Sequence, residues 1–165
     1  MVSPFPAGLR AEAVRLLDAC RAKGKTIALA ESCTGGLVAA LLTEIAGSSD
    51  VLERGFVVYT NIAKMENLGV SAEILEKFTA VAEETAIAMA KGTLAHSHTT
   101  LALAVTGIAG PGGASEGKPV GLVHLCVAER DGRVLHERHV FPGSREDVRM
   151  AALARGIAML QALVE

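Results

Sequence analysis

Two patterns of apolar residues alternate along this chain. In the first, an apolar residue recurs every three or four positions, which is typical of an amphipathic helix. In the second, a short run is apolar almost throughout, which is typical of a buried strand. The first pattern predicts helices over residues 7–22, 35–46, 61–68, 72–78, 83–95 and 144–163. The second predicts strands over residues 26–30, 55–59, 101–105, 120–129 and 134–141.

The order of these elements predicts an architecture. Asp131-Gly132 is a strong signal for a two-residue hairpin turn, so the strands at 120–129 and 134–141 are expected to pair antiparallel. The earlier strands are separated by helices, which is typical of parallel pairing. We expect a three-layer α/β/α sandwich with a mixed, mostly parallel sheet and a C-terminal hairpin and helix. With 165 residues, 50% of them apolar, the chain fits one domain over residues 1–165.

Charge and composition exclude several classes of partner. The chain has 16 basic and 18 acidic residues, so it carries no basic field that would attract nucleic acid. It has no Trp and one Tyr, and therefore lacks the aromatic platforms that stack on single strands. No apolar run approaches the roughly 18 residues that span a membrane. We expect neither a nucleic-acid nor a membrane partner.

The cysteines and the start of the chain indicate a compartment. The 3 cysteines form no C-x-x-C pair and are odd in number, which fits a reducing environment better than a disulfide framework. The opening residues lack the basic end and the apolar run of a signal peptide. We expect a cytoplasmic protein.

Polar residues gather where the strand at 26–30 gives way to a helix, in the segment Glu31-Ser32-Cys33-Thr34-Gly35-Gly36. The free N–H groups and positive dipole end of a helix N-terminus would favour an oxyanion there. A simpler interpretation is that Ser32 or Thr34 only caps the helix. Because capping needs one hydroxyl and leaves Glu31 unexplained, we treat the segment as a candidate site.

A second polar segment follows the next strand. Tyr59 ends that strand, and Lys64 falls in the first turn of a helix capped by Thr60 or Asn61. The helix dipole disfavours a cation there, and burial would also favour the neutral amine, so Lys64 could act as a general base. Alternatively, its long stem carries the ammonium to solvent or to Glu66, and Tyr59 is a packed ring.

A third segment, after the strand at 101–105, is rich in glycine. Its backbone N–H groups could surround a phosphate, although its spacing is neither that of Walker A nor that of a Rossmann fingerprint. A flexible surface loop is the alternative. Arg145 and Arg149, in the first turns of the last helix, could hold a phosphate or be solvated. The candidate loop residues are Thr106, Gly107, Gly110, Gly112 and Gly113.

The histidines do not indicate a metal site. His96 and His98 lie at a helix end, where a cationic imidazole complements the dipole, and the others fall on the hairpin strands without metal-ligand spacing. We expect no metal and no cofactor.

Together these segments resemble one family, the C-terminal domain of CinA and its stand-alone relatives of the PncC type, the nicotinamide-nucleotide amidohydrolases. The CinA name is associated with competence and DNA damage. The likeness runs from about Arg10 to the C-terminus, in order and with little change of spacing. It is carried by residues 30–36, 46–49, 55–64, 106–113, 115–121 and 141–143, followed by Arg145 and Arg149.

The resemblance implies hydrolysis of the carboxamide of nicotinamide mononucleotide to nicotinate mononucleotide and ammonia, a step of pyridine-nucleotide recycling in NAD metabolism. The Ser, Tyr and Lys set of the family falls on Ser32, Tyr59 and Lys64. Ser32 would then be the nucleophile, and neutral Lys64, aided by Tyr59, its base. A small-molecule pyridine nucleotide is the expected partner. The residues expected to bind it are Glu31, Thr34, Gly35, Gly36, Asn61, Thr106, Gly107, Gly110, Gly112, Gly113 and Arg145.

Two positions depart from the family pattern. Ala82 stands where the family usually has Ser, and Ile62 stands where a polar residue is common. The alternative to an amidohydrolase is therefore a nucleotide-binding or regulatory module that kept the pocket without useful turnover. In either case the many small residues favour a homodimer or higher homo-oligomer. Without the N-terminal molybdopterin-binding-like domain of full CinA, the stand-alone form is expected.

Overall fold

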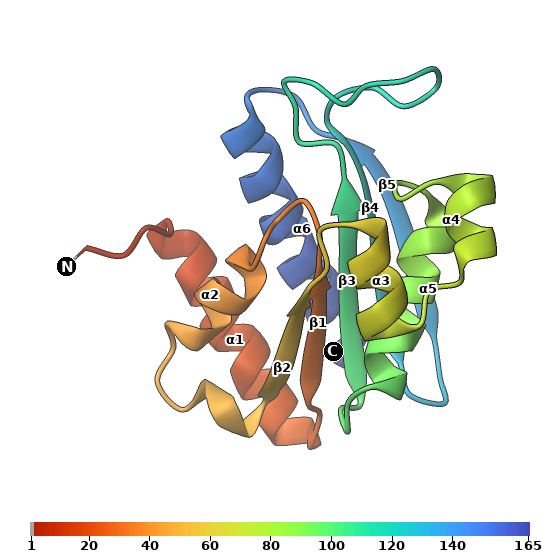
Figure 1. The fold of residues 1–165 in the computed structure, drawn as a ribbon. Coiled ribbons are helices and arrows are strands. Elements are labelled where there is room, and N and C mark those ends of the chain that lie inside the picture. The colour runs from red at the N-terminus through yellow and green to blue at the C-terminus, as the bar shows by residue number, and fades with distance from the viewer. Residues whose placement is uncertain (1) are drawn as a thin grey trace.

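The computed structural model describes residues 2–165 and contains a five-stranded sheet (Figure 1). β1 pairs parallel with β2 and β3, whereas β4 pairs antiparallel with β3 and β5. Every strand except β4 therefore runs in the same direction, which confirms the mixed, mostly parallel sheet and its C-terminal hairpin. The order across the sheet is β2 (Leu52–Val57), β1 (Ile27–Glu31), β3 (Leu101–Gly107), β4 (Leu122–Glu129) and β5 (Val134–Val140).

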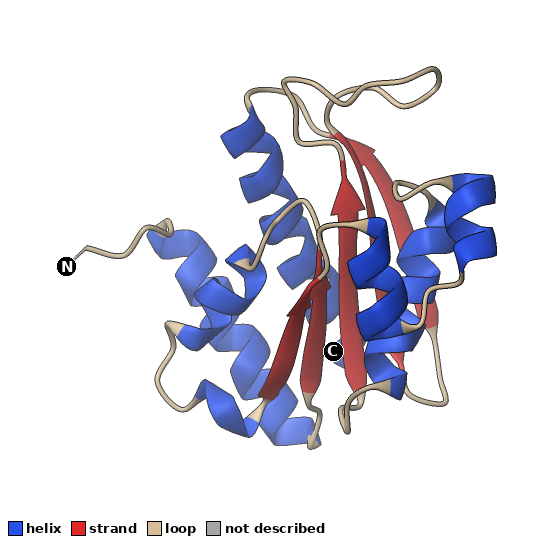
Figure 2. Cartoon of the chain, viewed as in Figure 1, coloured by secondary structure: helices blue, strands red, loops and turns tan. Residues whose placement is uncertain are grey.

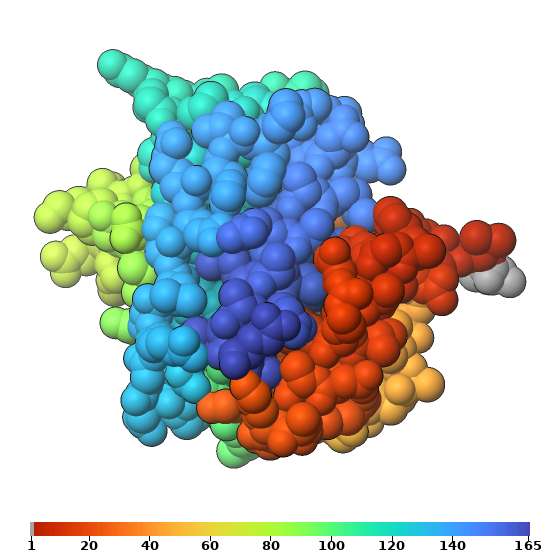
Figure 3. Space-filling view, turned by 180° about the vertical axis from the view of Figure 1, so that it is seen from behind, coloured from red at the N-terminus to blue at the C-terminus, as the bar shows by residue number. Residues whose placement is uncertain are grey.

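Helices cover both faces of the sheet and give the three layers that the sequence predicts (Figure 2). One face carries α1 (Ala7–Lys23), α2 (Leu37–Thr43) and α6 (Arg145–Val164). The other face carries α3 (Asn61–Leu68), α4 (Ala72–Phe78) and α5 (Glu83–Ala95), and a 3-10 turn (Ser48–Asp50) leads into β2. From behind, α6 lies beside α1, and the loop between β3 and β4 projects from the top (Figure 3). Among residues 2–165, no helix is both long and apolar enough to span a membrane.

Large and small side chains alternate in the central strand β3 and make its two faces different. Leu101, Leu103 and Val105 pack toward α1 and α6, whereas Ala102 and Ala104 pack toward α5. This division follows from the period of two in a strand, which sends successive side chains to opposite faces. Because only methyl groups stand on the second face, α5 can lie close to the sheet.

The predicted boundaries coincide with the observed ones in α3, α4 and α5 and differ most in β2 and α2. β2 begins at Leu52 rather than at residue 55, because an edge strand with exposed faces tolerates the charged residues that hid its start. α2 begins at Leu37 rather than at residue 35, because Gly35 and Gly36 have φ angles of 59° and 101°. Both angles lie in the left-handed region, outside a helix.

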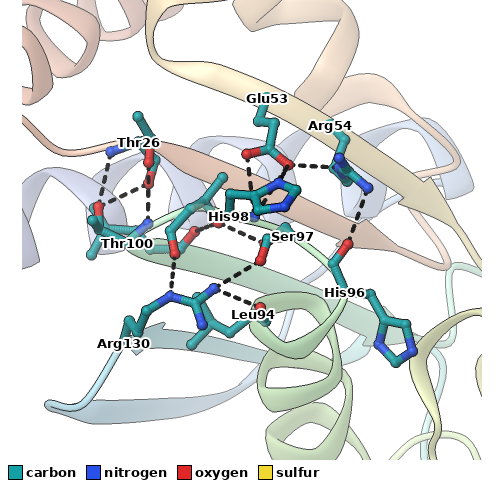
Figure 4. A network of polar contacts seen from close by, with 11 residues as sticks. Thr26, Glu53, Arg54, Leu94, His96, Ser97, His98, Thr100 and Arg130 are labelled. Atoms are coloured by element: carbon teal, nitrogen blue, oxygen red, sulfur yellow. Dashed lines mark hydrogen bonds and ion pairs between the residues drawn. The ribbon is translucent and has the colours of Figure 1, made fainter.

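Side chains tie the loops together where β1 and β3 begin (Figure 4). The backbone N–H of Thr26 donates to the Thr100 hydroxyl at 2.9 Å, and that of Thr100 donates to the Thr26 hydroxyl at 3.1 Å. Nearby, the Arg130 guanidinium fixes the end of α5 by donating to carbonyl oxygens. These belong to Leu94, Ser97 and Thr99, at 2.6, 3.0 and 2.8 Å. The amino end of the sheet is thereby braced.

A glycine lets α3 pack directly on α5. A Cβ added to Gly92 would overlap the carbonyl oxygen of Leu68, the last residue of α3, and would lie 2.9 Å from its carbonyl carbon. Any side chain at this position would therefore push the two helices apart. The placement of α3 depends on this contact.

We predict that Gly92→Ala lowers the free energy of unfolding by about 2–3 kcal/mol, because the added methyl group overpacks the contact between α3 and α5. Urea denaturation followed by circular dichroism measures this change. Gly8→Ala is the matched control, since Gly8 lies in α1 with nothing within 4 Å of an added Cβ. We expect that control to be unchanged or about 0.5 kcal/mol more stable. Equal stability of the two variants would contradict the prediction.

Candidate active site

The three polar segments meet at the edge of the sheet where β1 and β3 end, beside the start of α6 (Figure 1). They surround a cavity of about 230 Å³, which we name the edge pocket. Parallel strands bring their carboxyl ends to one edge, where α/β proteins usually bind ligands. The edge pocket is lined by Ser32, Cys33, Tyr59, Lys64, Ala80, Val81, Thr106, Gly107, Ile108, Ala109, Gly110, Gly112, Gly113 and Arg145.

A buried contact between Ser32 and Lys64 lies in the edge pocket. Ser32 directly follows β1, and its backbone N–H donates to Val105 O at 3.0 Å, which extends the pairing of β1 with β3. Lys64 Nζ donates to Ser32 Oγ at 3.2 Å and to Val58 O at 2.9 Å. The side chains are almost enclosed, since Ser32 is 7% and Lys64 1% exposed. The fold thus joins a hydroxyl and an amine from two separate segments.

Burial changes the proton equilibrium of Lys64. Loss of hydration disfavours the ammonium and lowers the pKa of Lys64 from its ordinary 10.5, and only a smaller opposing effect comes from Cys33. The Thr60 hydroxyl caps α3 by accepting from Ala63 N at 3.2 Å, so Lys64 lies in the first turn. The helix dipole there also disfavours a cation. No carboxylate belongs to the lining residues, so no acidic side chain of the edge pocket pairs with the ammonium.

The Glu31 carboxylate caps α2, a role that differs from the expected contact with substrate. It is 1% exposed and accepts from Val38 N at 2.9 Å and from Ala39 N at 3.0 Å. The expected hydroxyl caps, Ser32 and Thr34, do not serve α2, whose N-cap is Gly36 without a side-chain bond. Glu31 therefore takes two of the N–H groups in the first turn of α2.

Several other expected binding residues lie outside the edge pocket. Asn61 starts α3 and is exposed, and Gly35 and Gly36 form the left-handed turn before α2. Thr34 is fully buried, and among residues 2–165 its hydroxyl has no hydrogen-bond partner. The structure therefore does not bring these four residues to the cavity with Ser32 and Lys64.

Arg145 connects two walls of the edge pocket. Its guanidinium donates to Gly110 O at 2.9 Å and to Tyr59 Oη at 3.0 Å. Tyr59 is 60% exposed, and among the described residues its hydroxyl forms no hydrogen bond with Ser32 or Lys64. The remaining N–H groups of Arg145 are free for an anion, so Tyr59 and Arg145 form a polar margin to the buried pair.

The glycine-rich loop presents backbone donors. Ala109, Gly110, Gly112 and Gly113 line the edge pocket, and their N–H groups have no acceptor within residues 2–165. Such unpaired N–H groups can bind an anion as a nest does. The loop therefore has free backbone donors for the expected cradle.

The backbone of Gly107 supplies a further donor close to Ser32. Ile108 N donates to Leu122 O at 2.8 Å, toward β4. Because hydrogen-bonding directions alternate along an antiparallel strand, the N–H of Gly107 points to the other side, where Ser32 follows β1. A Cβ at this position would lie 2.7 Å from Val123 Cγ2, 2.8 Å from Leu122 O and 3.1 Å from the Cys33 sulfur, so only glycine fits there.

Two side chains that were expected to bind a ligand form hydrogen bonds with backbone carbonyl oxygens. Thr106 Oγ1 donates to Ala80 O at 2.7 Å. Arg149, considered for a phosphate, donates to Cys33 O at 3.0 Å and to Thr34 O at 3.1 Å. Arg149 follows Arg145 by one helical turn of α6, and the sequence singled out both for their place in its first turns.

Part of the apolar lining was not among the residues expected to form the site. Ala80 and Val81 lie in the turn between α4 and α5, where short apolar residues suggest no chemistry. The departures from the family pattern lie outside the lining. Ala82 is the N-cap of α5 without a side-chain bond, and Ile62 is 65% exposed. Within residues 2–165, no three His, Cys, Asp or Glu side chains are grouped to hold a metal ion.

Comparison with known proteins gives relatives that belong to one family. The chain matches the family described as CinA C-terminal domain over residues 10–164. It is 50% identical over 139 residues to the nicotinamide-nucleotide amidohydrolase PncC of Enterobacter agglomerans, covering 84% of this chain and 85% of that protein. It is 53% identical over 126 residues to a CinA-like protein of Chlorobium phaeovibrioides, covering 76% of this chain but 29% of that protein. The chain thus spans less than a third of that longer relative.

A solved structure has the same fold. The crystal structure of the competence/damage inducible protein CihA from Agrobacterium tumefaciens superposes with a TM-score of 0.97 at 48% sequence identity. The superposition covers 99% of this chain and 100% of that one. The likeness therefore includes the edge of the sheet that carries the edge pocket.

We predict that Glu31→Gln lowers the free energy of unfolding by about 1–3 kcal/mol, because the amide offers one acceptor oxygen to two buried N–H groups. Thermal and urea denaturation measure the loss. Glu76→Gln is the control, since Glu76 is exposed on α4, and we expect a change below about 0.5 kcal/mol. A Glu31→Gln protein as stable as this control would show that the cap contributes nothing.

Proposed function

Because this chain belongs to the CinA C-terminal domain family, we propose that it is a nicotinamide-nucleotide amidohydrolase. It would convert the carboxamide of nicotinamide mononucleotide to the carboxylate of nicotinate mononucleotide, with release of ammonia. The observation that carries the proposal is the 3.2 Å contact between the buried Lys64 amine and the Ser32 hydroxyl. The PncC name of a relative that covers 84% of this chain supports the same activity.

The size and lining of the edge pocket suit part of such a nucleotide. Its volume of about 230 Å³ is below the range of roughly 300–1,000 Å³ typical of small-molecule sites. The pyridine ring and its carboxamide would therefore enter, between the apolar Ala80–Val81 wall and the glycine loop. The ribose and phosphate would stay at the mouth, where the free N–H groups of Arg145 and of the loop can receive an anion.

In the first chemical step, the neutral Lys64 amine takes the proton of the Ser32 hydroxyl as Oγ bonds to the amide carbon. The carbonyl oxygen becomes an oxyanion. The N–H of Gly107, directed toward Ser32, is the donor best placed to stabilise it, an interaction worth roughly 3 kcal/mol. We prefer this donor to the α2 N-terminus, where Glu31 already accepts from the N–H groups of Val38 and Ala39.

In the second step, the Lys64 ammonium gives its proton to the amide nitrogen and the C–N bond breaks. Ammonia departs, and the acyl group remains bound to Ser32 as an ester. Water then attacks this ester while Lys64 accepts one of its protons. The bond between Ser32 and the acyl carbon breaks, and the proton goes back to Ser32. The sum is amide plus water giving carboxylic acid plus ammonia. Tyr59, which is hydrogen-bonded to Arg145, would assist Lys64 from the mouth of the edge pocket.

The expected homo-oligomer is supported by apolar side chains exposed beside the edge pocket. Val57, Tyr59 and Ile62 are 54%, 60% and 65% exposed. Pairing of two copies would remove this surface from water. The assembly stays a prediction.

We predict that Ser32→Ala lowers the rate of ammonia release from nicotinamide mononucleotide by about 10³-fold or more, because the variant has no attacking oxygen. Cys33→Ala should keep the rate within about threefold, since burial raises the pKa of the Cys33 thiol to about 11 and keeps it protonated. A coupled ammonia assay gives the rates, and calorimetry gives nucleotide binding.

Two results would change this assignment. Loss of activity in Cys33→Ala but not in Ser32→Ala would transfer the role of nucleophile to the thiol. A wild-type protein that binds the nucleotide and releases no ammonia would be the nucleotide-binding module that the sequence also allows.

We predict that kcat/KM rises with pH and levels off, with a midpoint below the ordinary lysine pKa of 10.5. The sign follows from the base: only the deprotonated amine accepts the Ser32 proton, and burial lowers its pKa. Rates measured between about pH 6 and pH 10 test this. Lys64→Arg keeps a positive charge, but its guanidinium does not release a proton in this pH range. The rate of this variant should therefore be lower by about 10²-fold or more at every pH. A flat profile for the wild type would exclude Lys64 as the base.

A further inference from the structure

A lysine outside the edge pocket connects two of its walls. Lys118 lies in the loop between β3 and β4, where it forms a two-residue antiparallel bridge with Ser115. Its Nζ reaches the turn between α4 and α5 and donates to three oxygens there, which matches the three hydrogens of an ammonium. The acceptors are Phe78 O at 2.8 Å, Thr79 Oγ1 at 2.6 Å and Val81 O at 2.6 Å.

The turn that receives Lys118, residues 78–81, is held by side chains at every carbonyl. Lys118 binds the first and the last of the four. Thr85 Oγ1 donates to Thr79 O at 2.6 Å, and Thr106 Oγ1 donates to Ala80 O at 2.7 Å. Thr79 has a φ of 73°, in the left-handed region that a threonine adopts only when its surroundings impose it. Without these donors the turn would relax.

The same turn supplies a wall of the edge pocket. Ala80 and Val81 line the cavity together with Ile108 and Ala109 of the loop after β3. Lys118 belongs to the later part of that loop, so its three bonds tie one wall to the other. The space between these walls is where a flat ring would have to fit.

We propose that Lys118 is a positioning residue that sets the spacing between the 78–81 turn and the glycine loop, and thereby the affinity of the edge pocket for its ring-bearing ligand. The identity of that ligand rests on the proposed function, but the clamp itself does not. Lysine suits this role because its compact ammonium can point three donors at three converging oxygens, whereas the planar fork of arginine cannot.

The kinetic test uses Lys118→Met, which keeps the stem and removes the donors. We expect KM for nicotinamide mononucleotide to rise about tenfold while kcat changes less than about threefold, because the wall moves but the contact of Ser32 with Lys64 stays. The midpoint of the pH profile should not move. Lys77→Met is the matched control, since Lys77 lies beside the turn over the Phe78 ring and donates no bond to it. It should behave as wild type.

A second readout does not depend on the substrate. Cys33 lines the edge pocket and is 5% exposed, whereas Cys20 and Cys126 are fully buried elsewhere. In Lys118→Met, modification by a small thiol reagent, followed by mass spectrometry, should become about tenfold faster at Cys33 alone. If all three thiols react faster together, or if none does, Lys118 is only a general structural tie and the proposal is wrong.

The two readouts separate this proposal from the proposed function. A wild-type protein that releases no ammonia would refute the amidohydrolase while leaving the thiol experiment decisive for Lys118. Conversely, an active wild type whose Lys118→Met variant has unchanged KM and unchanged Cys33 reactivity would refute the clamp alone.

Discussion

The site depends on a lysine that the fold buries without a carboxylate beside it. Within residues 2–165, the Lys64 amine donates to two oxygens, Val58 O and Ser32 Oγ. A buried ammonium in such surroundings is costly, so the proton leaves more easily than in water. Lys64 lies on α3, which packs closely on α5 where Gly92 meets Leu68. The unfavourable burial of this amine thus lowers its affinity for a proton.

Polar side chains around the edge pocket divide into two groups with different tasks. Glu31, Thr106 and Arg149 form hydrogen bonds with the backbone of the surrounding segments. Ser32 and Lys64 face the cavity, together with unpaired N–H groups of the glycine-rich loop. Pre-organised backbone donors need no reorientation when charge develops, which is the usual origin of strong transition-state stabilisation. The first group therefore serves the second.

The sequence predicts the fold well because its signals are local. Thr60, one of the two caps considered for α3, serves as its N-cap, and Asp131-Gly132 marks the turn of the hairpin. The meeting of Ser32 and Lys64 at one edge also follows from strand order, once parallel pairing is assumed. The contacts of Thr106 with Ala80 and of Arg149 with Cys33 join positions 26 and 116 residues apart, and no spacing along the chain encodes them. This is why residues expected to touch a ligand turn out to hold the scaffold.

The edge strand β2 has one further consequence. Within the described part of the chain it pairs only with β1, and it exposes Glu53, Arg54 and Gly55 where a second neighbour could otherwise add. Charged side chains and a glycine on an outer strand discourage open-ended ladder growth, so the sheet is protected from aggregation at that border. A second copy meeting the molecule at this border would therefore contact side chains instead of extending the backbone ladder.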